Sequence, residues 1–442
     1  MAKGMKSTSY DHLGRLFTRG LILAVVLLPL VMTSAEATAQ EDDEQNLGDL
    51  ATQETASMRE ATYKELAKAQ EAAEAERFSE AIQTLDKLGK DELNHYERSQ
   101  LLNLYAYIYF AQDQVPKAIG TYEQLLNQPE LPEALTTSTV YTLSQLYFSE
   151  ENWQKSIGML ERWMSLTNED NKTAYEMMAQ AYYQLEQYNK ALRPAWKVIE
   201  LTQAAGEPIK EQSYLLLRVL HYEMEEYQQV IDILEELIKL FPKKQYWMQL
   251  ASIYGELDDQ QKQLNVLELA HLQDLLTTEN EILTLASLLL NNDLYARGGK
   301  ILSKGLDDGV ITSSLEHWRL LSQAWTMAHE NEKAIPALTK AAGLSPDGKL
   351  NVILAQTFMN LNRWDDSVNT IHLALSKGGL DRTDQAQVML GQALFELDRF
   401  EEARQAFQRA QSDQRSRQLS AQWINYIDSE ENRRAQLAAA LE

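Results

Sequence analysis

The chain has 442 residues, no cysteine, and 41 basic against 65 acidic residues, which gives a formal net charge of −24. Its hydrophobic fraction of 44% is enough to build a sizeable core, and its length allows about three domains or one long repeat array. The missing cysteines exclude disulfides, thiolate metal sites and cysteine nucleophiles, and the negative charge argues against nucleic acids and anionic membrane surfaces as partners.

Residues 1–39 have the pattern of a secretory signal peptide. Basic residues precede an apolar stretch over 21–32, and residues 37–39 (Ala-Thr-Ala) fit the A-x-A rule for signal peptidase, with 35–37 as an alternative site. This stretch is shorter than the roughly 20 residues that a transmembrane helix needs. We therefore expect cleavage near Ala39 and a mature chain without a membrane span; a retained signal-anchor is the alternative. Export of a cysteine-free chain fits the bacterial periplasm.

The segment after the cleavage site differs in composition from everything that follows. Residues 40–59 begin with an acidic run and show no hydrophobic period, which predicts a flexible leader. From residue 60 onward, apolar residues recur at i, i+3, i+4 and i+7, and proline is scarce. This pattern predicts an all-α fold.

An internal repeat organises residues 60–412. An aromatic residue, two or three polar residues and a small residue recur, for example over 78–82, 188–192 and 400–404. We call the small residue position 20; its successive copies lie 33 to 39 residues apart, close to the tetratricopeptide period of about 34. The ten aligned residues are Ala81, Ala118, Ser156, Ala191, Val230, Gln263, Gly298, Ala334, Ser367 and Ala403.

Three further positions complete the pattern. Position 8 is small in most repeats, so the two helices of a repeat can approach closely, and position 32 is proline in two repeats, which ends the second helix. Position 11 is aromatic, as in Tyr109, Tyr147, Tyr182, Tyr254, Trp325 and Phe358. The whole pattern resembles the tetratricopeptide repeat (TPR) family. That resemblance implies a right-handed superhelical α-solenoid of about ten helix-turn-helix units.

Two regions depart from the regular pattern. Gly298, Gly299 and Gly305 fall inside the predicted second helix of repeat seven, where each costs about 1 kcal/mol relative to alanine. We interpret them as a locally soft repeat or hinge, or as an error of register. Residues 413–442 contain several large apolar side chains and then a polar run, which predicts a C-terminal capping helix and tail.

Motifs for catalysis or cofactor binding are nearly absent. Residues 329–333 begin like a zinc-protease helix, but Lys333 stands where the second histidine is required. Residues 298–300 lack the upstream glycine of a phosphate-binding loop. Acidic pairs such as 258–259 and 365–366 fall at predicted turns, where carboxylates favour the start of a helix. We therefore expect no enzyme activity, no metal site and no cofactor.

The family resemblance implies a concave groove lined by positions 2, 5, 9 and 12 of each first helix. Position 9 is glutamine in six repeats and position 12 is aromatic in five. Carboxamides can pair with the backbone of an extended peptide, and rings can anchor it; alternatively, glutamine serves as a helix former and the rings brace neighbouring helices. The predicted partner-binding residues are Phe110, Gln145, Phe148, Gln180, Tyr183, Tyr222, Gln323, Gln356, Gln392 and Phe395. Whether the groove or the convex face binds stays open.

A narrower resemblance concerns four runs of sequence. Residues 246–264, 324–338, 360–368 and 374–380 are similar to the exported TPR protein of marine proteobacterial TonB clusters, a family described as a component of TonB systems. The resemblance implies a periplasmic accessory to the motor that energises outer-membrane receptors, with iron-siderophore uptake as its usual task. The alternative is a scaffold for outer-membrane or cell-wall assembly. The expected partners are proteins, among them TonB-system components.

Overall fold

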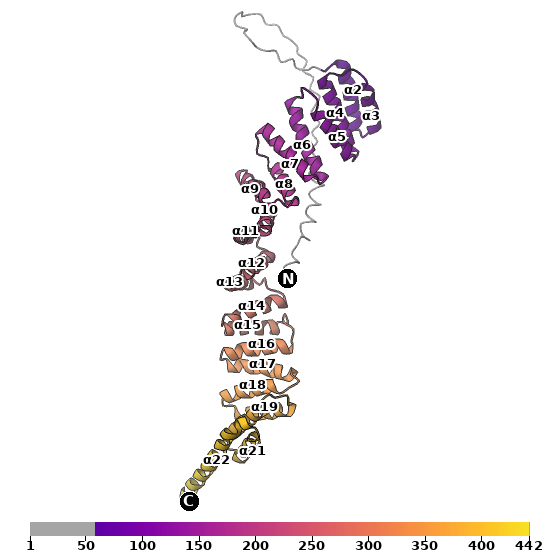
Figure 1. The fold of residues 1–442 in the computed structure, drawn as a ribbon. Coiled ribbons are helices and arrows are strands. Elements are labelled where there is room, and N and C mark those ends of the chain that lie inside the picture. Colours follow the sequence, from indigo (N-terminus) through magenta and orange to yellow (C-terminus); the bar gives the residue numbers. More distant parts are fainter. Residues whose placement is uncertain (1–57, 442) are drawn as a thin grey trace, which may run out of the picture. The chain divides into compact units, whose positions relative to one another are not determined.

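The computed structural model describes residues 58–441, and within them it contains 21 helices and no strand (Figure 1). The predicted all-α solenoid is therefore confirmed. The predicted signal peptide and nearly all of the predicted leader lie outside the described residues. The chain divides into two compact units, Met1–Leu237 and Ile238–Glu442, and each is described by itself.

Twenty of the helices form ten hairpins, each made of the first and second helix of one repeat. In repeats one to five the helices are α2 (Glu60–Glu74), α3 (Phe78–Leu88), α4 (His95–Ala111), α5 (Val115–Leu126), α6 (Glu133–Ser149), α7 (Trp153–Thr167), α8 (Lys172–Gln184), α9 (Tyr188–Ala204), α10 (Glu211–Glu223) and α11 (Tyr227–Leu240). In repeats six to ten they are α12 (Lys244–Glu256), α13 (Gln260–Leu272), α14 (Glu279–Asn291), α15 (Tyr295–Asp307), α16 (Leu315–Met327), α17 (Asn331–Leu344), α18 (Lys349–Asn360), α19 (Trp364–Lys377), α20 (Thr383–Glu396) and α21 (Phe400–Ala410). The last helix, α22 (Gln414–Leu441), follows repeat ten.

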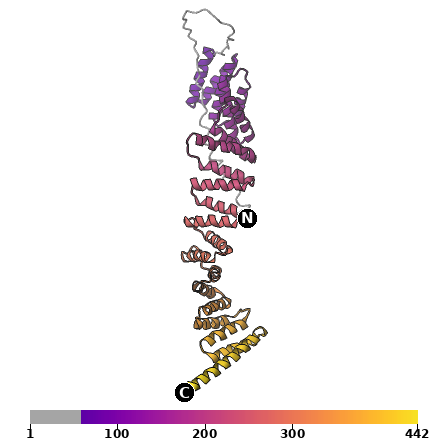
Figure 2. The same ribbon diagram turned by 90° about the vertical axis from the view of Figure 1, so that its left-hand side faces the viewer.

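Within each unit, neighbouring hairpins pack as successive layers. Figure 1 shows this for α14 to α19, and the indigo-to-magenta helices of the first unit stack in the same way in Figure 2. A single hairpin cannot bury its own apolar face, so the core is continuous from layer to layer within a unit.

Small residues at positions 8 and 20 bring the two helices of a repeat together. Ala81, Ala334 and the other alanines at position 20 are fully buried. Where serine replaces alanine, its hydroxyl donates a hydrogen bond across the helix pair: Ser156 Oγ to the carbonyl of Ser144 at 2.8 Å, and Ser367 Oγ to the carbonyl of Ala355 at 3.1 Å. In each case the acceptor is the residue at position 8. These bonds require the two backbones to be in close contact.

Repeat six keeps this contact although position 20 is large. Gln263 occupies the position, and its amide packs against Gly255. A Cβ atom on residue 255 would stand only 2.7 Å from Gln263 Nε2. Gly255 lies eight residues earlier, on the first helix of the same repeat. The large side chain of Gln263 on α13 is thus accommodated by the missing side chain of Gly255 on α12.

The glycines of repeat seven lie in a continuous helix, α15, in the predicted register. A Cβ at Gly298 would stand 2.9 Å from Leu290 Cδ2, one at Gly299 would stand 2.9 Å from the Trp325 ring, and one at Gly305 would stand 2.6 Å from Ile311 Cδ1. All three glycines therefore have a packing role that the sequence analysis missed. They let both α14 and the next repeat approach the α15 backbone.

Every turn between the two helices of a repeat contains one non-glycine residue in the left-handed conformation. It stands five residues before position 20, and its φ lies between 56° and 59°. The ten residues are Glu76, Asp113, Glu151, Glu186, Glu225, Asp258, Asp293, His329, Asn362 and Asp398. Eight of them are acidic, so many of the acidic residues that the sequence places at turns occupy this strained position.

The C-terminal helix α22 packs on repeat ten through aromatic rings and arginines. Trp423 stacks on Phe407 with ring centroids 5.4 Å apart. Arg404 of α21 donates to Asp428 at 2.8 Å and to Glu431 at 2.6 Å, both on α22. These contacts cover the outer face of the last hairpin as a capping helix would.

Candidate binding surface

Positions 5, 9 and 12 of a first helix are separated by four and three residues, so they lie on one face of that helix. In repeats three, four and five this face belongs to α6, α8 and α10, which are successive first helices of the first unit. We call the resulting nine side chains the central array. Its members are Tyr141, Gln145 and Phe148 on α6, Glu176, Gln180 and Tyr183 on α8, and Leu215, Val219 and Tyr222 on α10.

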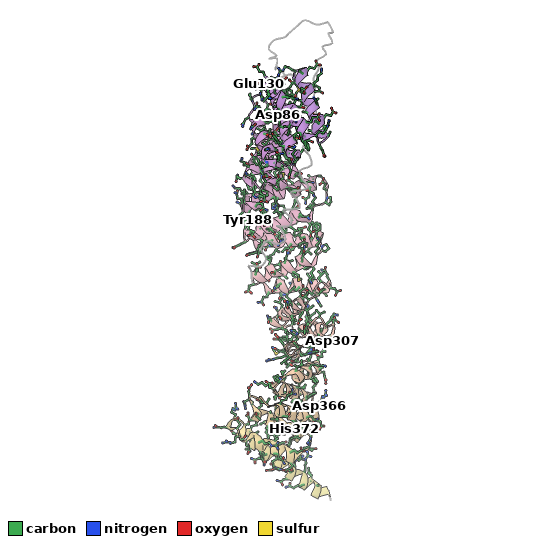
Figure 3. All side chains as sticks on the ribbon, turned by 90° about the vertical axis from the view of Figure 1, so that its right-hand side faces the viewer. Asp86, Glu130, Tyr188, Asp307, Asp366 and His372 are labelled. Atoms are coloured by element: carbon green, nitrogen blue, oxygen red, sulfur yellow. The ribbon has the colours of Figure 1, made fainter. Side chains whose placement is uncertain are left out.

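All nine side chains of the central array are half-buried. Its position-12 rings contact an aromatic residue at the start of the second helix of the same repeat. The ring centroids are 5.0 Å apart for Phe148 and Trp153, and 5.9 Å apart for Tyr183 and Tyr188. Of these four residues, Tyr188 is labelled in Figure 3. The rings thus brace the turn of their own repeat, and this holds each of them in a fixed place on the array.

The aromatic residue at position 11 has a different role. In five repeats a lysine at the start of the second helix stands over its ring, with Nζ 4.8 to 5.9 Å from the centroid. Such contacts contribute about 0.5–1 kcal/mol at exposed sites. The pairs are Lys117 with Tyr109, Lys155 with Tyr147, Lys190 with Tyr182, Lys262 with Tyr254 and Lys333 with Trp325. Position 11 is therefore part of the hairpin structure.

Five of the ten predicted binding residues belong to the central array: Gln145, Phe148, Gln180, Tyr183 and Tyr222. Phe110 is half-buried against the core of repeats two and three. In the second unit Gln323 and Gln356 are exposed, and Gln356 donates to Asn360 Oδ1 at 3.1 Å. Gln392 is half-buried on α20.

Phe395 belongs to the packing of the capping helix. Its ring centroid is 5.6 Å from that of Trp423 and 5.3 Å from that of Tyr426, both on α22, and 5.4 Å from that of Phe400. Phe395 was predicted to bind a partner, but in the structure α22 lies against its ring.

Four members of the central array were not singled out from the sequence: Tyr141, Glu176, Leu215 and Val219. Their position numbers would have found them, because they occupy positions 5 and 9 of the same three repeats. These four side chains differ in residue type from one repeat to the next, so no recurring amino acid identifies them. Tyr141 also contacts Trp163 of α7, with ring centroids 4.9 Å apart.

Glu176 is the one acidic residue of the central array. Burial raises the pKa of its carboxyl group above the usual range, and the more distant positive charges of Lys210 and Lys172 oppose that rise. Burial also raises the pKa of the Tyr141 hydroxyl, and the negative charge of Glu176 adds to the effect. The two groups therefore lie close enough on adjacent first helices to interact.

An uncharged hollow lies in the second unit. It has a volume of about 390 Å³ and lies over the equivalent face of α14, with Gln263 of α13 at its border. It is lined by Gln263, Asn280, Leu283, Thr284, Ser287, Leu288 and Asn291. None of these side chains was predicted as a binding residue, and all of them are neutral.

The described residues contain neither a cluster of metal-binding side chains nor a helix suited to cross a membrane. Within residues 58–441, no group of three or more histidine, aspartate and glutamate side chains could hold a metal ion. In the same part of the chain, none of the helices combines the length and the apolar character needed to cross a membrane.

Stacked hairpins with small residues at the helix contacts and variable residues on the first-helix faces define a helical repeat protein that presents interaction surfaces. The tetratricopeptide repeat family model matches two segments, residues 66–134 and 354–418. The two matched segments are tetratricopeptide repeats, and repeats of this kind form protein–protein interaction scaffolds. No curated protein matches the chain.

Solved structures of low sequence identity resemble the chain. A structure of Naa15/Naa10 bound to HypK-THB has 12% identity and a TM-score of 0.41; the match covers 82% of this chain and 66% of that chain, just under two thirds. A tetratricopeptide repeat protein from Parabacteroides merdae ATCC 43184 has 16% identity, coverage of 67% and 99%, and a TM-score of 0.33. MamA 41-end from Desulfovibrio magneticus RS-1 has 15% identity, coverage of 41% and 99%, and a TM-score of 0.30.

Proposed function

We propose that the central array on repeats three to five binds an extended segment of a partner protein. The observation that carries this proposal is the alignment of these side chains: nine half-buried residues stand at the same three positions of three successive first helices. Half-buried aromatic and aliphatic groups lose their remaining contact with water when a partner covers them, and this favours association.

The chemistry of the array suits a peptide in an extended conformation. Gln145 and Gln180 each offer a donor and an acceptor, which is what the amide and carbonyl of a peptide backbone need. Phe148, Tyr183 and Tyr222 are already braced, so little side-chain freedom is lost on binding. A scaffold with these features would recognise a segment by its backbone and by a few anchored side chains.

The same proposal extends to the place of action: the scaffold works in the periplasm as an accessory of a TonB-type system for outer-membrane uptake. Its support is the secretory pattern of residues 1–39 and the resemblance carried by residues 246–264, 324–338, 360–368 and 374–380. N-terminal sequencing of the protein from a periplasmic fraction should begin near Gln40. A full-length species held in the inner membrane would overturn the expected cleavage.

The partner can be sought by placing a photo-crosslinking amino acid at residue 148 in cells. We expect a crosslink to a TonB-system component, and a crosslink confined to outer-membrane or cell-wall assembly proteins would overturn that role. With the purified partner, Phe148→Ala combined with Tyr183→Ala should weaken binding about tenfold or more, which corresponds to about 1.4 kcal/mol.

The matched control is Asn189→Ala combined with Gln203→Ala, two exposed positions on the second helix α9. This control should bind as the wild type does. Far-UV circular dichroism and melting temperature must agree for all three proteins, so that a loss of binding cannot come from a broken hairpin. Wild-type affinity in a folded aromatic double variant would show that the central array is not the binding surface.

A further inference from the structure

We infer that Glu176 pairs with a lysine or arginine side chain of the bound segment, so that the central array selects an extended segment with one cationic residue among uncharged neighbours. This inference rests on the proposed function and adds to it the chemical class of the partner.

Glu176 lies on the middle helix of the central array. It lies on α8, the middle of the three first helices, at the position that Tyr141 occupies on α6 and Leu215 occupies on α10. Gln180 follows it one helical turn later on the same face. The remaining eight side chains of the array carry no charge at neutral pH, so Glu176 is the one ionic determinant that a segment lying across the array would meet.

Several carboxylates of the same unit have a hydrogen-bond or ion-pair partner, and Glu176 has none within the described part of the chain. In the same unit, Glu123 accepts from Lys155 at 3.2 Å, Glu161 accepts from the Tyr182 hydroxyl at 3.1 Å, and Asp170 forms an ion pair with Lys197 at 3.0 Å. Among residues 58–441, no hydrogen bond or ion pair reaches the carboxylate of Glu176. Other acidic side chains of this unit without such a partner, among them Glu151, Glu169 and Glu186, are exposed, whereas Glu176 is half-buried.

The two nearest lysines leave that carboxylate open. Lys172 lies one turn earlier on α8, and it is paired with Glu207. Lys210 is exposed in the segment before α10, and it acts on Glu176 only through its distant charge. A half-buried carboxylate without a partner is costly, and a cation brought by a ligand would relieve that cost.

The side chains at the same position on the two adjacent first helices suit a long cationic side chain. The methylene groups of lysine or arginine can pack against Tyr141 and Leu215, and the charged end can also interact with the tyrosine ring. Acidic residues clearly outnumber basic ones in residues 58–237, so the field of this unit attracts cations. The same field and the same carboxylate disfavour an anionic segment.

Selection from a random 12-residue peptide library displayed on phage tests the inference, with the mature chain (residues 40–442) as the target. We expect the enriched peptides to share one lysine or arginine at a fixed place. In fluorescence-anisotropy titrations, Glu176→Gln should weaken their binding about tenfold, as should replacement of that peptide lysine by norleucine. The two changes together should cost little more than either alone, because each removes the same pair.

Glu200→Gln is the control, because Glu200 is exposed on the second helix α9 and pairs with Lys197 there. It should leave the affinity unchanged. Glutamine is nearly the same size as glutamate, so Glu176→Gln should keep the wild-type melting temperature and circular dichroism. A charge swap, Glu176→Lys with glutamate in the peptide, should restore part of the binding.

The possible failures are distinguishable. Peptides that need Phe148 and Tyr183 but show no shared cation, and bind Glu176→Gln as tightly as the wild type, would overturn this inference and leave the proposed function standing. Peptides whose binding is unaffected by Phe148→Ala with Tyr183→Ala would overturn the proposed function itself. A library that yields no peptide enriched on the wild type over that double variant would do the same.

Discussion

The indole ring of Trp325 lies against the backbone of Gly299, and a Cβ atom on residue 299 would stand only 2.9 Å from ring atom Cδ2. The two residues belong to neighbouring repeats, the ring to α16 and the glycine to α15. Trp325 is also the ring over which Lys333 stands at 4.9 Å. One aromatic side chain therefore joins repeat seven to repeat eight and both helices of repeat eight to each other.

Gly299→Ala should destabilise the second unit, although alanine is the better helix former by about 1 kcal/mol. The added methyl group would have to displace the indole ring, and overpacking of this kind costs about 1–3 kcal/mol. Thermal unfolding and hydrogen exchange of α15 to α17 measure the effect. Gly120→Ala is the control, because Gly120 lies within α5 and a Cβ there meets no atom within 4 Å. It should be neutral or stabilising; an equal loss in both variants would contradict the packing role of Gly299.

The need for a small residue at position 20 can be tested by enlarging Ala334, which is fully buried in α17. Ala334→Leu should loosen repeats seven to nine, since the two helices cannot separate without disturbing their neighbours. Ala334→Ser should be well tolerated, because serine stands at this position in repeats three and nine and donates to the carbonyl at position 8. Hydrogen exchange would distinguish them, and unchanged protection in the leucine variant would mean that the aligned register is wrong.

The stability of the first two repeats should depend on the charge of Glu97. Its carboxylate is fully buried, accepts from the Arg59 guanidinium at 2.6 Å and from the Asn94 backbone at 3.1 Å, and so links the start of α2 to the start of α4. Although burial alone would raise the pKa of Glu97, the hydrogen bonds from Arg59 and Asn94 outweigh it and hold the pKa at about 2. The ordinary value is about 4.3, so the folded state favours the ionised form.

This stabilisation should be complete above about pH 5 and should disappear as the pH falls towards 2, because the unfolded chain binds the proton first. Glu97→Gln does not titrate there and should cost about 1–3 kcal/mol at neutral pH. The difference between wild type and variant should therefore shrink on acidification, as measured by hydrogen exchange of α2 and α4. Glu80→Gln, which breaks an exposed pair with Arg77, should cost under about 1 kcal/mol. A pH-independent difference for Glu97→Gln would contradict the assignment.

The capping helix should protect repeat ten mainly through Trp423. Trp423→Ala removes the ring that stacks on Phe407 and contacts Phe395, and it should cost about 3 kcal/mol. Tyr426→Ala removes a ring that is 54% exposed, so it should cost much less. Protease sensitivity and exchange of α20 and α21 should rise in the first variant only. Equal effects would show that the cap acts through its whole length.

The fold could be predicted because its determinants recur. Small residues at positions 8 and 20 and rings at position 11 are repeated about every 34 residues, so each repeat supports the register of the others. The pair of Gln263 and Gly255 shows what recurrence cannot reveal: a compensation between two helices that occurs once. The glycines of repeat seven were interpreted as a soft segment for the same reason, since no recurring position shows that Trp325 and Ile311 pack against them.

The binding surface could be predicted only in part, because its chemistry varies from repeat to repeat. Gln145 and Gln180 could be found because glutamine recurs at position 9. Glu176 could not, because glutamate occurs at position 5 in repeat four only. Phe395 has the same position as Phe148, but α22 lies against its ring because it is in the last repeat. Position numbers give the face on which a residue lies; they do not give what covers it.

The left-handed residue in every turn has a consequence for engineering. A residue other than glycine in this conformation costs about 1–2 kcal/mol, and glycine or asparagine removes much of that cost. Because the ten positions lie in separate repeats, the gains should be nearly additive. Replacement of Glu151, Glu186 and Asp293 by glycine should therefore raise the melting temperature stepwise while it also lowers the negative charge. The chain thus contains ten separate sites at which thermal stability can be adjusted one repeat at a time, without changing any residue of the central array.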